Sequence, residues 1–183
     1  MPSTRISLIL VLALGACLVA CTTSSTVSGK VALDRDAKWA ILPLENHTDT
    51  PQSALSAEAI AEHGLRARGI TSIAHYPAAL SRDSLFEPTE RRTVDEARKW
   101  AREQGAQYGL TGAVEEWRYK VGIDGEPAAA VTLQLLDLTT GQVVWSASGA
   151  KSGWSRDSLA GVAQKLMEEL LGSISLERKD GAR

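Results

Sequence analysis

The spacing of hydrophobic residues changes part-way along the chain and indicates two kinds of structure. In the first part there are two short apolar runs, at 39–44 and 70–76. After each run, and an intervening loop, comes a segment whose apolar residues recur every three or four positions. Later, apolar residues alternate with polar ones through 108–123, 129–138 and 143–150. A repeat near 3.6 predicts a helix, and a short apolar run or a repeat of two predicts a strand.

Three helices are expected between and after these strands. Thr50–Pro51 offers an N-cap and a proline at the first helical position, so the first helix should run to about Arg68. Thr93–Glu96 reads Thr-Val-Asp-Glu, a capping box that predicts the start of the second helix. The third should begin after Ser155, its expected N-cap, and carries a clear apolar stripe between 159 and 174.

The order of the elements predicts the fold class. Strands alternate with helices in the first part, and the last three strands are joined by short turns at 124–127 and 139–141. Short turns between alternating strands predict an antiparallel meander. We therefore expect an α/β fold, a single mixed sheet with a C-terminal antiparallel meander, packed by about three helices on one face.

The first twenty residues have the pattern of an export signal. Arg5 precedes an almost wholly apolar run, Ile6–Ala20, as in a signal peptide. The run is short for a transmembrane helix, which needs about 20 apolar residues. Leu18–Cys21 reads Leu-Val-Ala-Cys before a polar segment and resembles the lipobox of bacterial lipoproteins. Cys17 is a second candidate, but cleavage there would leave three apolar residues at the start of the mature chain.

The lipobox resemblance implies a lipid-anchored protein. In lipoproteins the cysteine, here Cys21, receives a diacylglyceryl group, and its new amino group is usually acylated, with palmitate for example. Two or more acyl chains hold a protein stably on a membrane, at about 0.8 kcal/mol per buried CH₂. Thr22, rather than aspartate, follows the cysteine, which resembles the pattern of lipoproteins sent to the outer membrane. The expected location is the periplasmic face of the outer membrane.

These patterns divide the chain into four segments. Residues 1–20 form the signal peptide, 21–38 a lipidated flexible tether, 39–175 the α/β periplasmic domain, and 176–183 a frayed tail. The tether prediction rests on a polar composition with little apolar surface to bury. Removing the first 20 of 183 residues leaves 163, which suits one domain.

Charge and cysteine content restrict the possible partners and the covalent structure. Arg5 is the only charged residue in the signal peptide, so cleavage changes the formal net charge from −2 to −3. With this net charge the chain lacks the excess of lysine and arginine that is typical of nucleic-acid-binding proteins. Both cysteines lie at the signal junction, and Cys21 is the only one retained. An internal disulfide in the mature chain is therefore excluded.

No recognisable catalytic pattern is present. His47, His63 and His75 lack metal-ligand spacing to other histidines, cysteines or acidic residues. Glu115 and Glu116 are adjacent, and on a regular strand adjacent side chains point to opposite faces, so they should not form a carboxylate pair. Glu62 is expected on a solvated helix face. The chain is predicted to be no enzyme and to use no metal or cofactor.

Two stretches carry a family resemblance. Residues 39–52, Trp-Ala-Ile-Leu-Pro-Leu-Glu-Asn-His-Thr-Asp-Thr-Pro-Gln, resemble the opening of a group of periplasmic lipoprotein domains that includes the curli secretion channel, LpoB and PelC. Residues 108–158, with Thr-Gly-Ala-Val-Glu-Glu-Trp-Arg-Tyr-Lys and Ser-Gly-Trp-Ser-Arg-Asp-Ser, resemble the PelC family. The resemblance extends over about 39–171.

The resemblance implies a role in secretion. Proteins of the PelC family form a lipid-anchored homo-oligomeric ring, a dodecamer, beneath the outer membrane. The ring accompanies an outer-membrane export porin and guides the cationic Pel exopolysaccharide of biofilms towards it. The implied partners are thus the outer membrane, the porin, the cationic polysaccharide and further copies of the chain.

The resemblance also assigns roles to individual residues. It implies that Trp154 faces the membrane, where indole rings favour the headgroup level. It places Asp124, and with it Glu126, in an acidic turn that guides the polysaccharide, because a repeated acidic turn attracts cations. Each has a structural alternative. Trp154 could close the edge of the core, and Asp124 suits an Asp-Gly turn by turn chemistry alone.

Other functions remain open at this stage. An activator of a peptidoglycan synthase, similar to LpoB, would usually need a long tether to cross the periplasm, whereas 22–38 reaches at most about 60 Å. A curli-type channel would need additional membrane hairpins, for which 163 of the 183 residues leave little room. A small lipoprotein domain with no defined partner is the fourth possibility.

Overall fold

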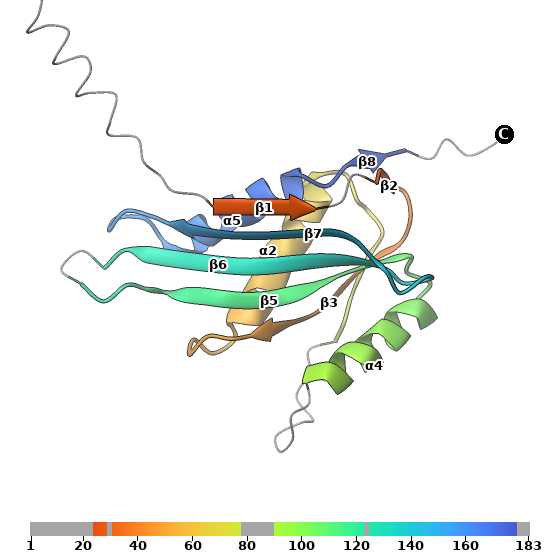
Figure 1. Cartoon of the computed structure of the whole chain (residues 1–183), viewed down its shortest axis with the longest axis horizontal. Coiled ribbons are helices and arrows are strands. Elements are labelled where there is room, and N and C mark those ends of the chain that lie inside the picture. The colour runs from red at the N-terminus through yellow and green to blue at the C-terminus, as the bar shows by residue number, and fades with distance from the viewer. Residues whose placement is uncertain (1–23, 29–30, 78–89, 123–124, 179–183) are drawn as a thin grey trace, which may run out of the picture.

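A computed structural model describes residues 24–28, 31–77, 90–122 and 125–178 (Figure 1). It confirms an α/β fold built on a mixed sheet. The six-stranded sheet has the order β1-β7-β6-β5-β3-β4, and β2 and β8 form a separate parallel pair. The elements are β1 (Ser24–Ser28), β2 (Leu33–Asp34), β3 (Trp39–Asn46), α2 (Ser53–Ala67), β4 (Ile73–His75), α4 (Glu90–Glu103), β5 (Tyr108–Tyr119), β6 (Pro127–Asp137), β7 (Val143–Ser152), α5 (Leu159–Gly172) and β8 (Leu176–Glu177).

The predicted C-terminal meander is confirmed. β5 pairs antiparallel with β6, and β6 pairs antiparallel with β7. The first part of the chain joins this meander through β3, which runs parallel to both β4 and β5. Trp117 of β5 and Trp145 of β7 are buried, at 6% and 2% exposure.

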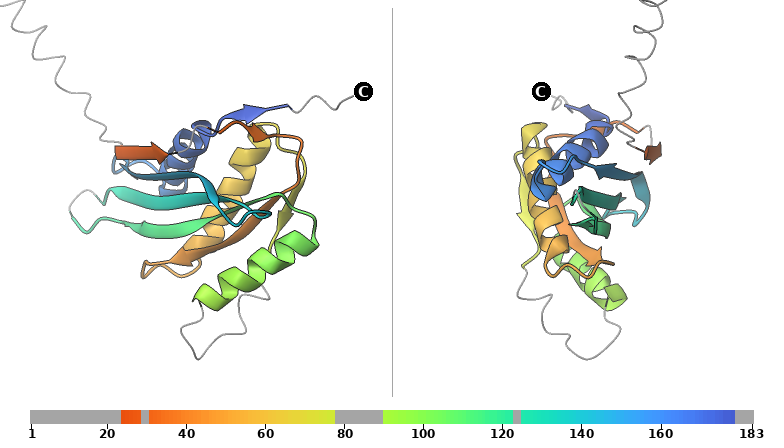
Figure 2. Two further views of the ribbon diagram at one scale, coloured as in Figure 1. Left: turned by 45° about the vertical axis from the view of Figure 1, so that its right-hand side comes forward. Right: turned by 90° about the vertical axis from the view of Figure 1, so that its left-hand side faces the viewer.

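The helices cover both faces of the sheet, which corrects the prediction of one covered face. Alternate residues of β3 divide between two apolar clusters. Trp39 and Ile41 pack with α2 and α5, whereas Ala40 and Leu42 pack with Ala97 of α4 and its neighbours on the opposite face. β3 is therefore buried on both sides, which explains why its sequence is a continuous apolar run rather than an alternating one. Figure 2 gives two further views of the arrangement.

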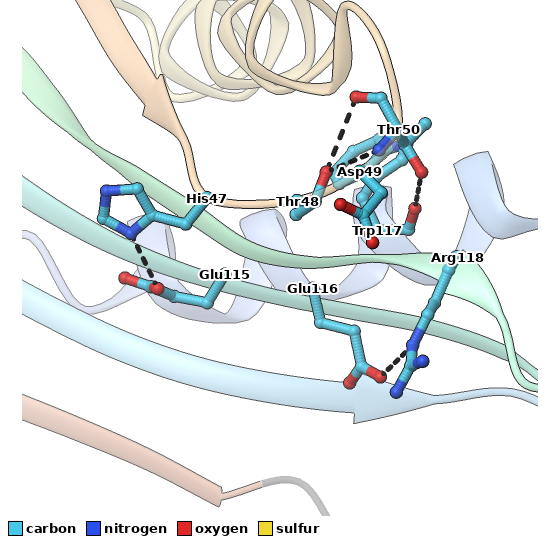
Figure 3. Close-up of a pocket in the computed structure, with 8 residues that line it drawn as sticks. All are labelled: His47, Thr48, Asp49, Thr50, Glu115, Glu116, Trp117 and Arg118. Carbon is cyan, nitrogen blue, oxygen red and sulfur yellow. Dashed lines mark hydrogen bonds and ion pairs between the residues drawn. The ribbon is translucent and has the colours of Figure 1, made fainter. Parts of the chain in front are cut away.

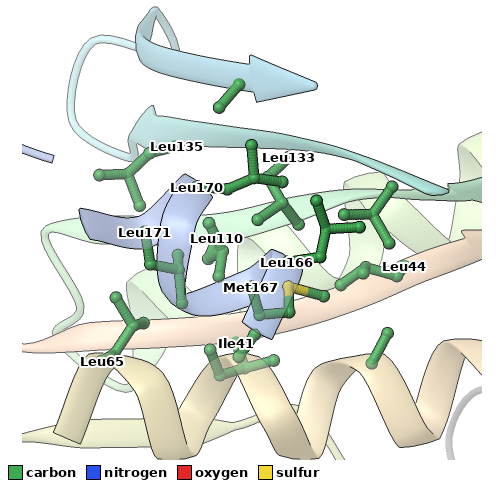
Figure 4. Packing of buried hydrophobic residues seen from close by; sticks show 14 of the residues in the cluster. Ile41, Leu44, Leu65, Leu110, Leu133, Leu135, Leu166, Met167, Leu170 and Leu171 are labelled. Atoms are coloured by element: carbon green, nitrogen blue, oxygen red, sulfur yellow. The ribbon is translucent and has the colours of Figure 1, made fainter. Parts of the chain in front are cut away.

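The larger cluster contains most of the hydrophobic core. α5 presents the apolar stripe that its sequence predicted, and α2 presents mostly small residues, so both helices approach the sheet closely (Figure 4). Each fully buried leucine contributes about 1.5–3 kcal/mol. The stripe of α5 comprises Val162, Ala163, Leu166, Met167, Leu170 and Leu171.

The structure contradicts a flexible tether through residue 38 and a frayed tail from residue 176. Ser24–Ser28 forms the edge strand β1, antiparallel to β7, and Leu33 is only 2% exposed. Leu33–Asp34 pairs with Leu176–Glu177. Serine and threonine side chains bury little surface, but the backbone of such a segment can still complete the ladder of a neighbouring strand.

The helix starts differ from the predicted caps. α2 begins at Ser53, after Gln52 with φ of 60°, and α4 begins at Glu90, three residues before the predicted capping box. α5 begins after Ser158, not Ser155, and the Ser158 hydroxyl accepts a hydrogen bond from the Gly161 N–H at 3.1 Å.

Within the described ranges, no helix combines the length and hydropathy needed to cross a bilayer.

Candidate functional site

The structure describes two of the four predicted site residues. Cys21 and Asp124 lie outside the described residues. Glu126 is half-buried and immediately precedes β6. Trp154 lies in the connection between β7 and α5 with 71% of its surface exposed. Trp154 therefore does not close the edge of the core within this chain.

Local hydrogen bonds hold the turn that presents Trp154. The Asp157 carboxylate accepts a hydrogen bond from the Trp154 N–H at 2.8 Å, and the Asp157 N–H donates to the Trp154 carbonyl at 2.8 Å. At Gly153 an added Cβ would lie 2.5 Å from a methyl carbon of Val162, so a larger residue would displace α5 or the turn. The exposed indole is thus carried on a well-anchored turn.

Glu126 and the turn that carries Trp154 lie at the same end of the sheet. The Gly153 N–H donates to the Pro127 carbonyl at 2.8 Å, and the Lys120 N–H donates to the Glu126 carbonyl at 2.7 Å. The Tyr119 hydroxyl accepts a hydrogen bond from the Leu159 N–H at 3.1 Å, which ties β5 to the start of α5. The end of β5, the start of β6 and the end of β7 lie at the left of Figure 1.

A β-bulge brings two glutamates to the same face of the sheet, which corrects the prediction that they point apart. Pairing between β5 and β6 passes from Val114 opposite Val131 directly to Glu116 opposite Ala130, so Glu115 is the inserted residue. An extra residue on one strand shifts the alternation by one position. The signal in the sequence was Val114 and Trp117, two core residues three positions apart within a strand.

The bulge forms one wall of a surface pocket of about 370 Å³ between β5 and the 47–50 loop (Figure 3). His47 lies between two carboxylates. Its Nδ1 is 3.0 Å from Glu115 Oε2 and its Nε2 is 3.1 Å from Glu45 Oε2. These hydrogen bonds, first that to Glu115 and then that to Glu45, raise the His47 pKa above its ordinary value of 6.5. The pocket is lined by His47, Thr48, Asp49, Thr50, Glu115, Glu116, Trp117 and Arg118.

A second histidine is held in the same way between β4 and α2. His75 Nε2 is 3.1 Å from Glu58 Oε2, and its Nδ1 is 2.9 Å from Glu62 Oε2. The Glu58 hydrogen bond raises the His75 pKa, against the opposing effect of burial. Burial opposes ionisation of Glu62, but hydrogen bonds from His75 and Arg66 outweigh it and lower the Glu62 pKa. Glu62 is therefore half-buried and paired, not a solvated residue.

Stability should fall as the pH rises through the pKa values of these histidines. A group whose pKa is higher in the folded state stabilises the fold fully below its unfolded pKa, near 6.5 for histidine, and loses that contribution above its folded pKa. We expect wild type to lose more stability between about pH 6 and about pH 8.5 than His75→Gln, measured by urea unfolding. His47→Gln should reduce the pH dependence of stability less than His75→Gln does, because the His47 side chain is more exposed than that of His75. Equal slopes in wild type and His75→Gln would contradict this expectation.

The carboxylates and histidines of these two clusters are hydrogen-bonded to one another. In the part of the chain that the structure describes, no three or more histidines, cysteines, aspartates or glutamates gather in a way that could hold a metal ion. The carboxylates of Glu115 and Glu116 are partnered by His47 and Arg118, with the Arg118 Nε 2.9 Å from Glu116 Oε1. The arrangement is an acidic surface with hydrogen-bonded carboxylates.

Comparison with known proteins identifies the family. The family model of the peptidoglycan-synthase activator LpoB matches residues 81–150, and no curated protein matches the chain. Among solved structures, the PelC dodecamer of Paraburkholderia phytofirmans is 40% identical, with a TM-score of 0.73 over 86% of this chain and 100% of that chain. A variant of that dodecamer in a second crystal form is 41% identical, with a TM-score of 0.74 over 85% and 100%.

A more distant structure shares the fold alone. Lipoprotein GNA1162 of Neisseria meningitidis is 19% identical, with a TM-score of 0.54 over 73% of this chain and 94% of that chain. The PelC match is of a different kind, because 40% identity extends over the whole of the solved PelC chain and over 86% of this chain. Because of this identity and coverage, the chain belongs to the PelC family.

Proposed function

We propose that this chain is a non-enzymatic lipoprotein of Pel-type exopolysaccharide export, anchored through Cys21 to the periplasmic face of the outer membrane. It forms a homo-oligomeric ring that guides a cationic polysaccharide towards an outer-membrane porin. The observation that carries the proposal is the 40% identity to a PelC dodecamer over 86% of this chain. A dodecamer is the expected assembly because two solved PelC structures, 40% and 41% identical to this chain, are both dodecamers.

The exposure of Trp154 supports this proposal. Trp154, 71% exposed on an anchored turn, suits a membrane-facing role. Glu126 belongs to the neighbouring acidic turn with Asp124, for which we propose the polysaccharide-guiding role. In a ring, every copy would contribute this turn at an equivalent position, so the negative potential towards the lumen would add up and draw in amino-sugar cations.

The second candidate is an LpoB-like activator of a peptidoglycan synthase, which the family-model match at residues 81–150 favours. The strand β1 argues against it. Because β1 begins at Ser24, only Thr22 and Thr23 separate Cys21 from the folded sheet. Two residues span less than about 10 Å, so the domain would stay close to the membrane that holds its lipid.

The oligomeric state tests the proposal. We expect the lipidated mature chain, extracted from membranes in mild detergent, to have the native mass of one discrete large ring across a range of concentrations, measured by native mass spectrometry and light scattering. A ring of identical subunits buries its interfaces symmetrically and closes at one size. A strict monomer, in detergent and in lipid alike, would contradict the ring and favour the activator.

The acidic turn provides the matched variant for the same experiment. Asp124→Asn with Glu126→Gln should leave the native mass unchanged but reduce polysaccharide secretion, measured by a polymer-binding stain in cells that carry the variant as their only copy. Arg118→Gln, at a basic site near the same strand end, should not reduce it. Undiminished secretion in the double variant would contradict the role given to these carboxylates.

A further inference from the structure

Exposed apolar side chains gather at the end of the sheet that carries the acidic and tryptophan turns. Val121 is fully exposed, Tyr119 is 52% exposed, and Trp154 is 71% exposed. Tyr119 is the last residue of β5, and Val121 lies two positions after it. The hydrogen bond between Gly153 and Pro127 holds the Trp154 turn against the start of β6, the strand paired with β5. Large exposed apolar groups that lie together indicate a binding surface.

The register of β1 identifies what this surface meets. Ser24 lies opposite Ala150 and Ser28 opposite Ser146, so the first residue of β1 lies towards the end of β7 that leads into Trp154. Cys21 precedes Ser24 by three residues, which span at most roughly 11 Å. An acyl chain on Cys21 would therefore enter the membrane beside this end of the sheet, and the β6–β7 turn would lie at the far end.

Two basic side chains lie beside this surface, together with the acidic side chain of Glu126. Lys120 lies between Tyr119 and Val121, and its ammonium group donates to Ser152 at 2.7 Å. Arg156, next to the Trp154 turn, is exposed. Lysine and arginine beside aromatic residues are typical of protein surfaces that contact headgroups. Asp157 has a different role in this region, since its carboxylate accepts the Trp154 N–H within the turn.

We propose that Tyr119, Val121 and Trp154 form one lipid-contacting surface, which the two-residue link between Cys21 and β1 holds against the headgroups of the membrane. The inference rests on the lipidation of Cys21 that the proposed function includes. It adds Tyr119 and Val121 to the membrane contact. It also implies that β1, fixed to the sheet and close to the lipid, acts as a strut: it sets the orientation of the domain on the membrane. The aromatic rings lie at the headgroup level.

A single introduced cysteine can test this surface. Once Cys21 is lipidated, the mature chain has no free thiol, so Val121→Cys can be labelled selectively with an environment-sensitive fluorophore. The lipidated protein is reconstituted into vesicles of phosphatidylethanolamine and phosphatidylglycerol that contain nitroxide-labelled lipid. We expect the label at position 121 to lose most of its fluorescence. The matched control is Gln142→Cys, exposed in the turn after β6, which should stay unquenched.

Several outcomes would overturn the inference. Equal quenching at positions 121 and 142 would show that this end of the sheet does not face the lipid. A label at 121 that is shielded to the same degree without vesicles would assign the surface to a contact between copies of the chain. A flexible Gly-Ser insertion of about 12 residues after Thr23 should release the strut and reduce quenching at 121, and unchanged quenching would contradict the role of the short link.

These failures are distinguishable from failure of the proposed function. Flotation of the protein with vesicles reports lipidation, and native mass reports the ring, and neither depends on residue 121. A protein that floats and forms a ring, but whose label at 121 is not quenched, would retain the proposed function and lose the lipid-contacting surface.

Discussion

Gly112→Ala should destabilise the chain by on the order of 3–5 kcal/mol, because neither the backbone nor the space at this position accepts a side chain. Gly112 lies in the central strand β5 with φ of 151°, and an added Cβ would lie 1.9 Å from the Thr132 carbonyl oxygen of β6. That oxygen belongs to a backbone paired on both sides, so it cannot move without disturbing the sheet. Urea unfolding would measure the loss against a total stability of about 5–15 kcal/mol.

Gly122→Ala is the matched control for this substitution. Gly122 lies near the end of the same strand, and an added Cβ would meet no atom within 4 Å. A change within about 0.5 kcal/mol is expected there, as for most surface substitutions. If Gly112→Ala unfolded at the same urea concentration as wild type, the close approach of β5 and β6 at this point would be wrong.

Glu58→Ala should cost about 2–4 kcal/mol, since it removes one buried carboxylate that serves two partners. Glu58 is 5% exposed, and its Oε1 accepts the Leu44 N–H at 2.9 Å while its Oε2 contacts His75. Leu44 lies where the pairing of β3 with β5 shifts register, one residue after Pro43. Without the carboxylate, the Leu44 N–H would remain buried without an acceptor.

The conservative variant separates the two contributions of Glu58. Glu58→Gln keeps a carbonyl oxygen for the Leu44 N–H but loses the charge that faces His75, so about half of the loss is expected at pH 6 to 7. Glu62→Ala, which removes the more exposed partner of His75, should cost less than Glu58→Ala. Equal and small effects of all three changes in urea unfolding would show that Glu58 is not a structural acceptor.

The strands and helices were predictable where a local pattern specifies them. Alternation between 108 and 150 identified all three strands of the meander, and the stripe on α5 identified the helix that covers the core. The helix starts were less predictable, because Thr50, Thr93 and Ser155 all have the side chains of N-caps. Cap chemistry permits several starts, and the packing of the helix decides which is used.

The candidate site was predictable only in part. The Ser-Gly-Trp-Ser segment marked Trp154, and its exposure agrees with a surface role. The carboxylate–histidine pairs were missed, because His47 and Glu115, or His75 and Glu58, are far apart in the sequence and their types alone carry no spacing signal. Their partners are set by which strand lies beside which, and that is a property of the sheet as a whole.

By itself the sequence determined the α/β class, the antiparallel meander and the resemblance to the PelC family, and it predicted an export signal with lipidation at Cys21, which stays a prediction. Only the tertiary structure decided that α4 covers the opposite face of β3, that a bulge puts Glu115 and Glu116 on one face, and that β1 runs beside β7 towards the Trp154 turn. The physical reason is common to all three. Periodicity specifies which side of an element is apolar, whereas the neighbour that covers that side is chosen by long-range pairing and packing across the whole domain.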